Sequence, residues 1–185
     1  MERKQVAELL ETLSDTEMLP SEYDFSRALV AVADYARVSL ATAESLTGGS
    51  ISSLITMTPG SSKVFRGGVV AYQSPIKIDV LGVSAELVQR VGVIHPDVAV
   101  AMAQGVARLM SADIAVGLTG VAGPDTQDGA SVGTVHLAVV DVKRGQTRVA
   151  SQRFDGSRGE IRQLSVLAAL GMLLDASLAH TDLQR

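Results

Sequence analysis

Three short apolar segments alternate with segments of helical periodicity in this chain, and that alternation limits the folds it can adopt. The apolar runs cover residues 38–43, 64–71 and 113–119, a length typical of buried strands. Residues 132–142 and 146–154 are two further strand-like runs, and the K-R-G sequence between them predicts a hairpin. Strands that alternate with helices before a final hairpin predict an α/β fold, namely a single three-layer α/β/α domain around a mixed sheet.

Apolar residues at helical spacing predict the remaining elements. Residues 1–13 predict a short amphipathic helix, and residues 14–22, which include Pro20, predict a linker. We therefore expect an N-terminal helical extension over residues 1–23 and one domain over residues 24–182. The helices expected in that domain cover residues 24–37, 49–58, 75–81, 84–90, 96–110 and 157–180. With 185 residues, 46% of them hydrophobic, the chain can bury one substantial core.

The composition disfavours several kinds of chemistry. The chain has no cysteine, which removes disulfides, thiolate nucleophiles and cysteine metal sites. Its three histidines, His95, His136 and His180, lie far apart without metal-ligand spacing, so we expect no metal. A net charge of -4 and 3% aromatic residues disfavour a nucleic-acid partner, and no apolar run predicts a membrane span. The charged N-terminus lacks the apolar core of a signal peptide, so we expect a cytoplasmic protein that binds a small molecule.

The first strand is followed by the sequence A-E-S-L-T-G-G at residues 43–49. A turn from strand to helix exposes a side chain at the carboxyl edge of a sheet, which favours Ser45 as a nucleophile. Flexible glycines allow the backbone N–H groups of Thr47, Gly48 and Gly49 to turn toward a developing oxyanion. The alternative is that Ser45 and Thr47 only cap the following helix.

The second strand is followed by Tyr72 and Lys77. If Ser74 caps the next helix and Pro75 opens it, Lys77 lies in the first turn, where the helix dipole disfavours a positive charge. Lysine can activate a serine where histidine and cysteine are not available, although a neutral lysine also requires burial. The alternatives are a solvated surface lysine and, for Tyr72, an aromatic residue at a strand end.

The third strand leads into a loop rich in glycine. Its G-x-x-G-x-x-G spacing from Gly117 matches neither a dinucleotide fingerprint nor a phosphate loop. Asp125 and Asp128 resemble part of a calcium loop, but the terminal glutamate is absent. Because the carboxyl ends of strands meet at the ligand crevice of α/β sheets, this loop and the two before it can build one site, to which Thr119 offers a hydroxyl or backbone donor.

Four ordered motifs resemble the CinA C-terminal domain family, whose members include nicotinamide-mononucleotide deamidases. They are A-T-A-E-S-L-T-G-G at residues 41–49, F-R-G-G-V-V-A-Y at 65–72, T-G-V-A-G-P at 119–124 and V-G-T-V at 132–135, within a resemblance that spans roughly residues 24–180. The resemblance implies that Ser45 is the nucleophile, that Tyr72 and Lys77 assist it, and that Thr119 and Gly120 lie near the substrate. It implies an amidohydrolase that converts nicotinamide mononucleotide and water to nicotinic acid mononucleotide and ammonia.

Two segments depart from the family pattern. Residues 125–131 replace a glycine-rich loop that commonly ends in Lys-Pro, and residues 93–95 read V-I-H where Ala-Val-Ser is frequent. Two other hypotheses therefore stay open: a hydrolase of a different amide, and a catalytically silent nucleotide-binding or stress-associated module.

A basic cluster near the start of the final helix supplies two candidate phosphate ligands. Arg153, Arg158 and Arg162 form a basic cluster, in which Arg158 or Arg162 is our candidate to bind the substrate phosphate. The alternative is a solvated basic face. We expect a homo-oligomer, a dimer or larger, that requires no cofactor.

Overall fold

The structure is a computed structural model that describes residues 2–14 and 21–183. A mixed five-stranded sheet lies at the centre of the molecule. The strands are β1 (Leu40–Glu44), β2 (Phe65–Val70), β3 (Ile114–Gly120), β4 (Thr134–Asp141) and β5 (Gln146–Arg153). Their order is β2-β1-β3-β4-β5. β1 runs parallel to both β2 and β3, whereas β3, β4 and β5 pair antiparallel. The mixed sheet and its final hairpin are as predicted.

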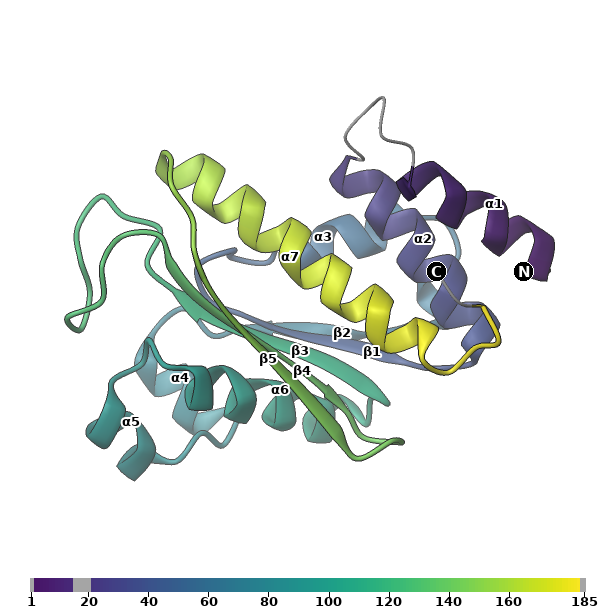
Figure 1. Ribbon diagram of the computed structural model, residues 1–185. Coiled ribbons are helices and arrows are strands. Elements are labelled where there is room, and N and C mark those ends of the chain that lie inside the picture. The colour runs from purple at the N-terminus through teal and green to yellow at the C-terminus, as the bar shows by residue number, and fades with distance from the viewer. Residues whose placement is uncertain (1, 15–20, 184–185) are drawn as a thin grey trace.

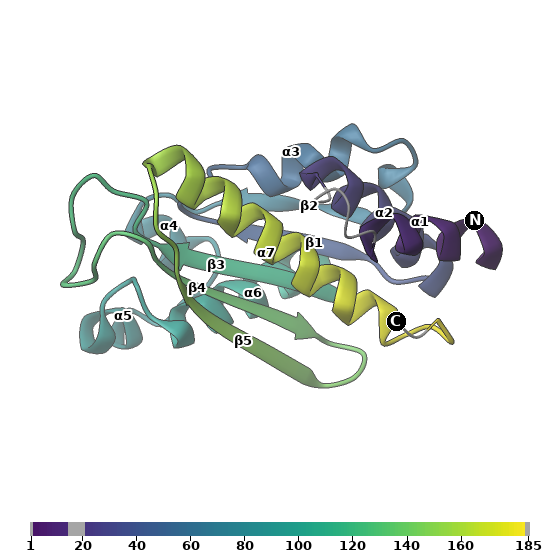
Figure 2. The same cartoon turned by 45° about the horizontal axis from the view of Figure 1, so that its top comes forward.

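Helices cover both faces of the sheet, which gives the predicted three layers (Figures 1 and 2). One face carries α1 (Arg3–Ser14), α2 (Glu22–Ala36), α3 (Ser50–Met57) and α7 (Arg158–Leu178). The other carries α4 (Ser74–Asp79), α5 (Ala85–Val91) and α6 (Pro96–Met110). A short 3-10 turn, Ser61–Lys63, precedes β2. The largest apolar cluster lies between the sheet and the α2–α7 layer, and a second one lies under α6.

The N-terminal helix belongs to the same core as the rest of the molecule. Val6 of α1 is fully buried, and Leu9, Leu10 and Leu13 pack against the cluster formed by α2 and α7. The linker predicted over residues 14–22 falls largely on residues 15–20, which lie outside the described residues. Its last residue already belongs to α2, which begins at Glu22 behind a capping box formed by Ser21 and Asp24.

The long final helix has the composition of a membrane span but the packing of a core helix. Among the described residues, α7 alone is long and apolar enough to cross a membrane. More than half of its apolar stretch is buried in the protein, and it packs along α2 and the sheet. We therefore assign α7 to the core of the domain.

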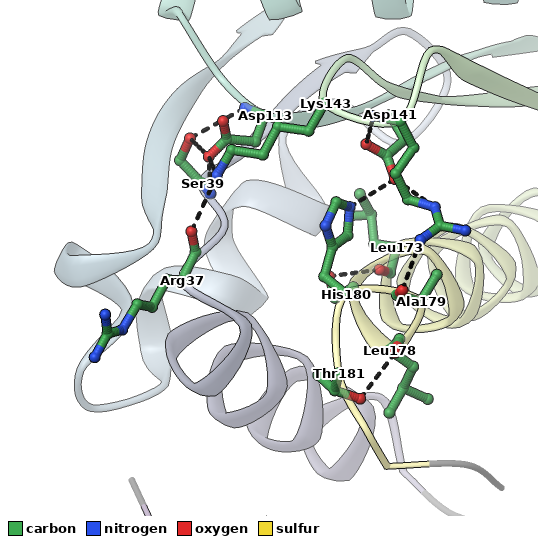
Figure 3. A network of polar contacts seen from close by, with 12 residues as sticks. Arg37, Ser39, Asp113, Asp141, Lys143, Leu173, Leu178, Ala179, His180 and Thr181 are labelled. Carbon is green, nitrogen blue, oxygen red and sulfur yellow. Dashed lines mark hydrogen bonds and ion pairs between the residues drawn. The ribbon is translucent and has the colours of Figure 1, made fainter.

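Polar contacts tie together the edge of the sheet where β1 and β3 begin (Figure 3). The carboxylate of Asp113 accepts two hydrogen bonds of 2.8 Å from Ser39 and pairs with Lys143 at 3.3 Å. Burial alone would raise the pKa of Asp113, but the Ser39 hydrogen bonds and the Lys143 ammonium outweigh it and lower that pKa. His180 Nε2 lies 2.7 Å from Asp141 Oδ2 and so joins the end of α7 to β4. The loops that carry the motifs lie at the opposite end of these strands.

Candidate active site

A cavity of about 510 Å³ lies at the carboxyl ends of the parallel strands. It is lined by the loops that follow β1, β2 and β3, by the start of α4, by Val93 and Ile94, and by Arg158 of α7. Three loops far apart in the sequence therefore meet at one site, as the strand order predicts. Its polar lining includes Ser45, Lys77 and Tyr72.

The fold brings the side chains of Ser45 and Lys77 together inside this cavity. Lys77 Nζ lies 3.1 Å from Ser45 Oγ and 2.6 Å from the carbonyl oxygen of Ala71, to which it donates a hydrogen bond. Lys77 is 1% exposed, and this burial lowers its pKa from 10.5 to about 8. The site thus pairs a serine hydroxyl with an amine that loses its proton near pH 8, the arrangement needed for an activated nucleophile.

The helix position predicted for Lys77 is wrong, and so is the alternative of a solvated lysine, whereas the burial that a neutral lysine was expected to require is confirmed. The helix cap is Gln73, not Ser74, and the helix has only six residues. Lys77 therefore lies in the last turn of α4, not the first, where the dipole would favour a positive charge. Its pKa is lowered by burial, which depends on the packing of several elements and not on its position in the helix.

The helix after the first motif is capped by Glu44, a residue that the sequence analysis did not single out. The N-cap position of α3 is Gly49, which has no capping side chain of its own. Instead the fully buried Glu44 carboxylate accepts hydrogen bonds of 2.9, 3.1 and 2.8 Å from the N–H groups of Gly49, Ile51 and Ser52. The alternative role of Ser45 as a helix cap is therefore wrong. The sequence signal for this cap is weak, because Glu44 lies five residues before the N-cap position Gly49.

Two of the three predicted oxyanion donors are already engaged elsewhere. The Gly48 N–H donates to the Ser45 carbonyl at 3.1 Å, and the Gly49 N–H donates to Glu44. Both glycines line a different hollow, between α3 and α7, so their assignment to the oxyanion site is corrected. The Thr47 hydroxyl also faces Glu44, at 2.9 Å. Within residues 2–14 and 21–183, the N–H groups of Leu46 and Thr47, the two residues after Ser45, have no acceptor, which leaves them as candidate oxyanion donors.

Tyr72 lines the cavity, but within the described part of the chain its hydroxyl is hydrogen-bonded to Arg158 and not to Ser45 or Lys77. It is 58% exposed, and its hydroxyl accepts a hydrogen bond of 3.0 Å from Arg158. The Arg158 guanidinium also donates to the Gly123 carbonyl at 2.7 Å. Arg158 and Tyr72 therefore form one side of the cavity mouth, where a substrate group with acceptor oxygens can reach them.

Arg162, one turn further along α7, does not enter the cavity. Its guanidinium donates to the carbonyls of Leu46 and Thr47 at 3.0 and 2.9 Å. Because Arg162 lines the hollow between α3 and α7 and not the cavity that holds Ser45, the candidate phosphate role passes to Arg158 alone.

The predicted Thr119 acts inside the protein, while its neighbour Gly120 lines the cavity. Thr119 is fully buried, and its hydroxyl donates to the Val93 carbonyl at 2.8 Å, so it holds the cavity wall instead of offering that proton to a ligand. The two segments that depart from the family pattern meet at this wall, because the Asp128 carboxylate accepts from the Val93 N–H at 3.4 Å.

Asp128 belongs to a hairpin turn. Asp128 and Gly129 both have positive φ, 50° and 77°, between the paired residues Gln127 and Ala130. The resemblance of this stretch to a calcium loop therefore reflects turn chemistry. Across the described part of the chain, no group of three or more acidic or histidine side chains is arranged to hold a metal ion.

Comparison with known proteins gives a consistent result. Residues 23–177 match the family model of the CinA C-terminal domain. A relative from Acetivibrio thermocellus, described as competence-damage inducible, is 37% identical over 174 residues, 94% of this chain and 41% of the relative. A CinA-like protein from Acidobacterium capsulatum is 43% identical over 136 residues, 73% of this chain and 32% of the relative. This chain thus spans about two fifths or less of the length of these relatives.

Solved structures match over nearly their full length. The crystal structure of the competence/damage inducible protein CihA from Agrobacterium tumefaciens superimposes with a TM-score of 0.81 at 34% identity, covering 86% of this chain and 98% of that one. A CinA superfamily protein from Escherichia coli gives a TM-score of 0.79 at 31% identity, covering 83% and 89%. The fold is therefore shared with these proteins.

Proposed function

The chain belongs to the CinA C-terminal domain family, and we propose that it is an amidohydrolase that converts nicotinamide mononucleotide and water to nicotinic acid mononucleotide and ammonia. The observation that carries the proposal is the buried Lys77 amine, 3.1 Å from the Ser45 hydroxyl. Its lowered pKa, about 8, supports its use as a general base.

In the first step, Ser45 attacks the carboxamide carbon while the neutral Lys77 amine takes the hydroxyl proton. One N–H of Lys77 is held by the Ala71 carbonyl at 2.6 Å, which leaves the nitrogen lone pair available to Ser45. The carbonyl oxygen becomes an oxyanion, for which the N–H groups of Leu46 and Thr47 are the proposed donors.

In the second step, the tetrahedral intermediate collapses. The C–N bond breaks, the Lys77 ammonium returns its proton to the departing nitrogen, and ammonia leaves. The remaining acyl ester on Ser45 is then attacked by water, whose proton passes to Lys77 and on to the Ser45 oxygen. Water and amide are thereby converted to a carboxylic acid and ammonia, between which one proton then passes to give carboxylate and ammonium. The Ser45–Lys77 pair returns to its starting state, and no redox step is needed.

The cavity supports a substrate that carries both charges of nicotinamide mononucleotide. Arg158 offers a guanidinium to a phosphate, and the carboxylate of Asp125, on the loop after β3, suits a pyridinium ring. A positively charged ring also withdraws electrons from its carboxamide, which favours attack by Ser45. The proposed pocket therefore binds a zwitterion, with the amide directed toward Lys77.

Ammonia release from the purified protein tests the proposal. We expect turnover of nicotinamide mononucleotide with equal amounts of ammonia and nicotinic acid mononucleotide, slower turnover of nicotinamide riboside, and little turnover of free nicotinamide. Hydrolysis of a different amide, with nicotinamide mononucleotide left intact, would retain the chemistry but refute the substrate. The absence of hydrolysis on a panel of amides would favour a catalytically silent module.

A further inference from the structure

The loop that carries Ser45 is held from two sides by groups of opposite charge. On the inner side, Glu44 takes the N–H groups of residues 49, 51 and 52 and also accepts from the Thr47 and Ser52 hydroxyls at 2.9 and 2.7 Å. On the outer side, Arg162 reaches from α7 to the carbonyls of Leu46 and Thr47. An anion thus binds the N–H groups at the end of the loop, and a cation binds the carbonyls at its centre.

The carbonyls held by Arg162 determine where the neighbouring N–H groups point. In a planar trans peptide the C=O and the N–H point in opposite directions. Because the Leu46 carbonyl faces Arg162 on α7, the Thr47 N–H of the same peptide faces away from α7. The Ser45 carbonyl is likewise held inside the loop by the Gly48 N–H at 3.1 Å, which directs the Leu46 N–H outward. Among the described residues, neither of these two N–H groups has a hydrogen-bond acceptor.

We infer that Arg162 is a positioning residue, which orients the Leu46–Thr47 peptides so that their N–H groups stabilise the oxyanion formed when Ser45 attacks. The inference rests on the proposed serine chemistry but not on the identity of the substrate. Arg162 acts through the loop backbone and does not contact the substrate, since it lies outside the cavity that holds Ser45 and Lys77.

The role requires arginine in particular. The guanidinium binds two carbonyls at once, through Nε to Leu46 at 3.0 Å and through a terminal nitrogen to Thr47 at 2.9 Å. A lysine ammonium is a single point charge on a flexible stem and does not reproduce this planar, two-point contact. Arg158 lies on the same helix but contacts Tyr72 and Gly123, so substitutions at the two arginines have separable effects.

The test compares Arg162→Gln and Arg162→Lys with the wild-type protein, and uses Arg153→Gln as the matched control because Arg153 is an exposed arginine of β5. The first readout is the rate at which a fluorophosphonate probe labels Ser45. That reaction also places negative charge on an oxygen beside the serine, and it does not depend on the natural substrate. The second readout is kcat and KM on nicotinamide mononucleotide. Melting temperatures report whether each variant is folded.

Loss of one oxyanion donor typically lowers kcat about 100- to 1,000-fold, so we expect a loss of that order in both labelling rate and kcat for Arg162→Gln, with KM within about threefold. Arg162→Lys, which keeps the cation and is the variant expected to fold if Arg162→Gln does not, should lose less but still clearly. Arg153→Gln should match the wild type.

Three results would overturn the inference. One is an unchanged labelling rate in folded Arg162 variants. Another is a rise in KM for nicotinamide mononucleotide at constant kcat, which would make Arg162 a phosphate ligand. The third is an equal loss in Arg153→Gln, which would indicate a general charge effect. Failure of the proposed function gives a different result: the probe would label Ser45 of the wild-type protein, but the protein would not hydrolyse nicotinamide mononucleotide.

Discussion

At the scale of the residue, the buried amine of Lys77 determines the pH range in which Ser45 can be activated. Burial penalises the ammonium and lowers its pKa to about 8. The neutral base therefore predominates above that pH and becomes scarce below it. Arginine at this position would remain protonated throughout the same range.

We predict that kcat/KM rises with pH, is half-maximal near pH 8 and is level above it, because the free enzyme must have lost the Lys77 proton. Lys77→Arg should be nearly inactive at every pH. The stability should also increase with pH. Between about pH 8 and 10.5 the unfolded chain binds more protons at Lys77 than the folded protein does. The free energy of unfolding of the wild type should therefore rise with pH over this range, relative to that of Lys77→Met. A pH–rate profile that is flat from pH 6 to 9 would remove Lys77 from the role of base.

The proposed role of Arg158 is to bind the phosphate of the substrate. Arg158→Gln should weaken use of nicotinamide mononucleotide by about 1.5–3 kcal/mol in transition-state binding, the range for a charge-assisted hydrogen bond. It should scarcely change the use of nicotinamide riboside, which has no phosphate. Measuring kcat/KM on both substrates checks this, and an equal loss on the two would contradict it.

The sequence predicted the residues of this site better than their contacts. Ser45 and Lys77 follow successive strands, and sheet topology brings such positions together. Arg158 and Arg162 are one helical turn apart, so sequence alone does not tell which one faces the cavity; packing of α7 against the Ser45 loop decides it. The role of Glu44 was missed because its three N–H partners converge only when the loop is folded.

At the scale of the element, close backbone contacts determine how the helices lie on the sheet. At Gly117 of β3, an added Cβ would lie 2.4 Å from backbone atoms of Ala99 and Ala103 on α6. At Gly171 of α7, the nearest atom to an added Cβ is 3.9 Å away, on Phe25. The first glycine is required by packing, whereas the second leaves room for a methyl group.

We therefore predict opposite effects for two identical changes. Gly117→Ala should destabilise the protein by about 1–3 kcal/mol, because α6 must move off β3. Gly171→Ala should stabilise it by about 0.5–1 kcal/mol, because alanine loses less entropy in a helix. Urea unfolding measures both, and a Gly117→Ala protein as stable as the wild type would show that α6 is not held as closely as described.

Long periodic helices were easier to predict from the sequence than short ones. The bounds of α6 are those predicted from its apolar period and from Pro96 at its start. The start of α4 was predicted one residue late. Ser74 is a residue type that commonly caps helices, but in the folded chain the N-cap is Gln73, which makes no side-chain capping hydrogen bond. Local signals fix periodic elements well and short ones poorly, since the ends of short helices depend on tertiary contacts.

At the scale of the whole molecule, the N-terminal helix and the domain share one core. Val6 is fully buried against the α2–α7 layer. Val6→Ala should lower the free energy of unfolding by about 1.5–3 kcal/mol, through lost apolar burial and the cavity left behind. Glu11→Ala, at an exposed position of the same helix, is the control and should stay within about 0.5 kcal/mol. Equal effects of the two would mean that α1 is not part of the cooperative unit.

The most direct test of the central claim compares ammonia release from nicotinamide mononucleotide by the wild-type protein and by Ser45→Ala, with melting temperatures measured on both. Ser45 does not cap α3, so the substitution should leave the fold intact. Loss of a nucleophile should lower kcat by at least about 1,000-fold. We expect a folded Ser45→Ala protein without measurable turnover. A folded variant that releases ammonia at a rate close to wild type would contradict the serine mechanism.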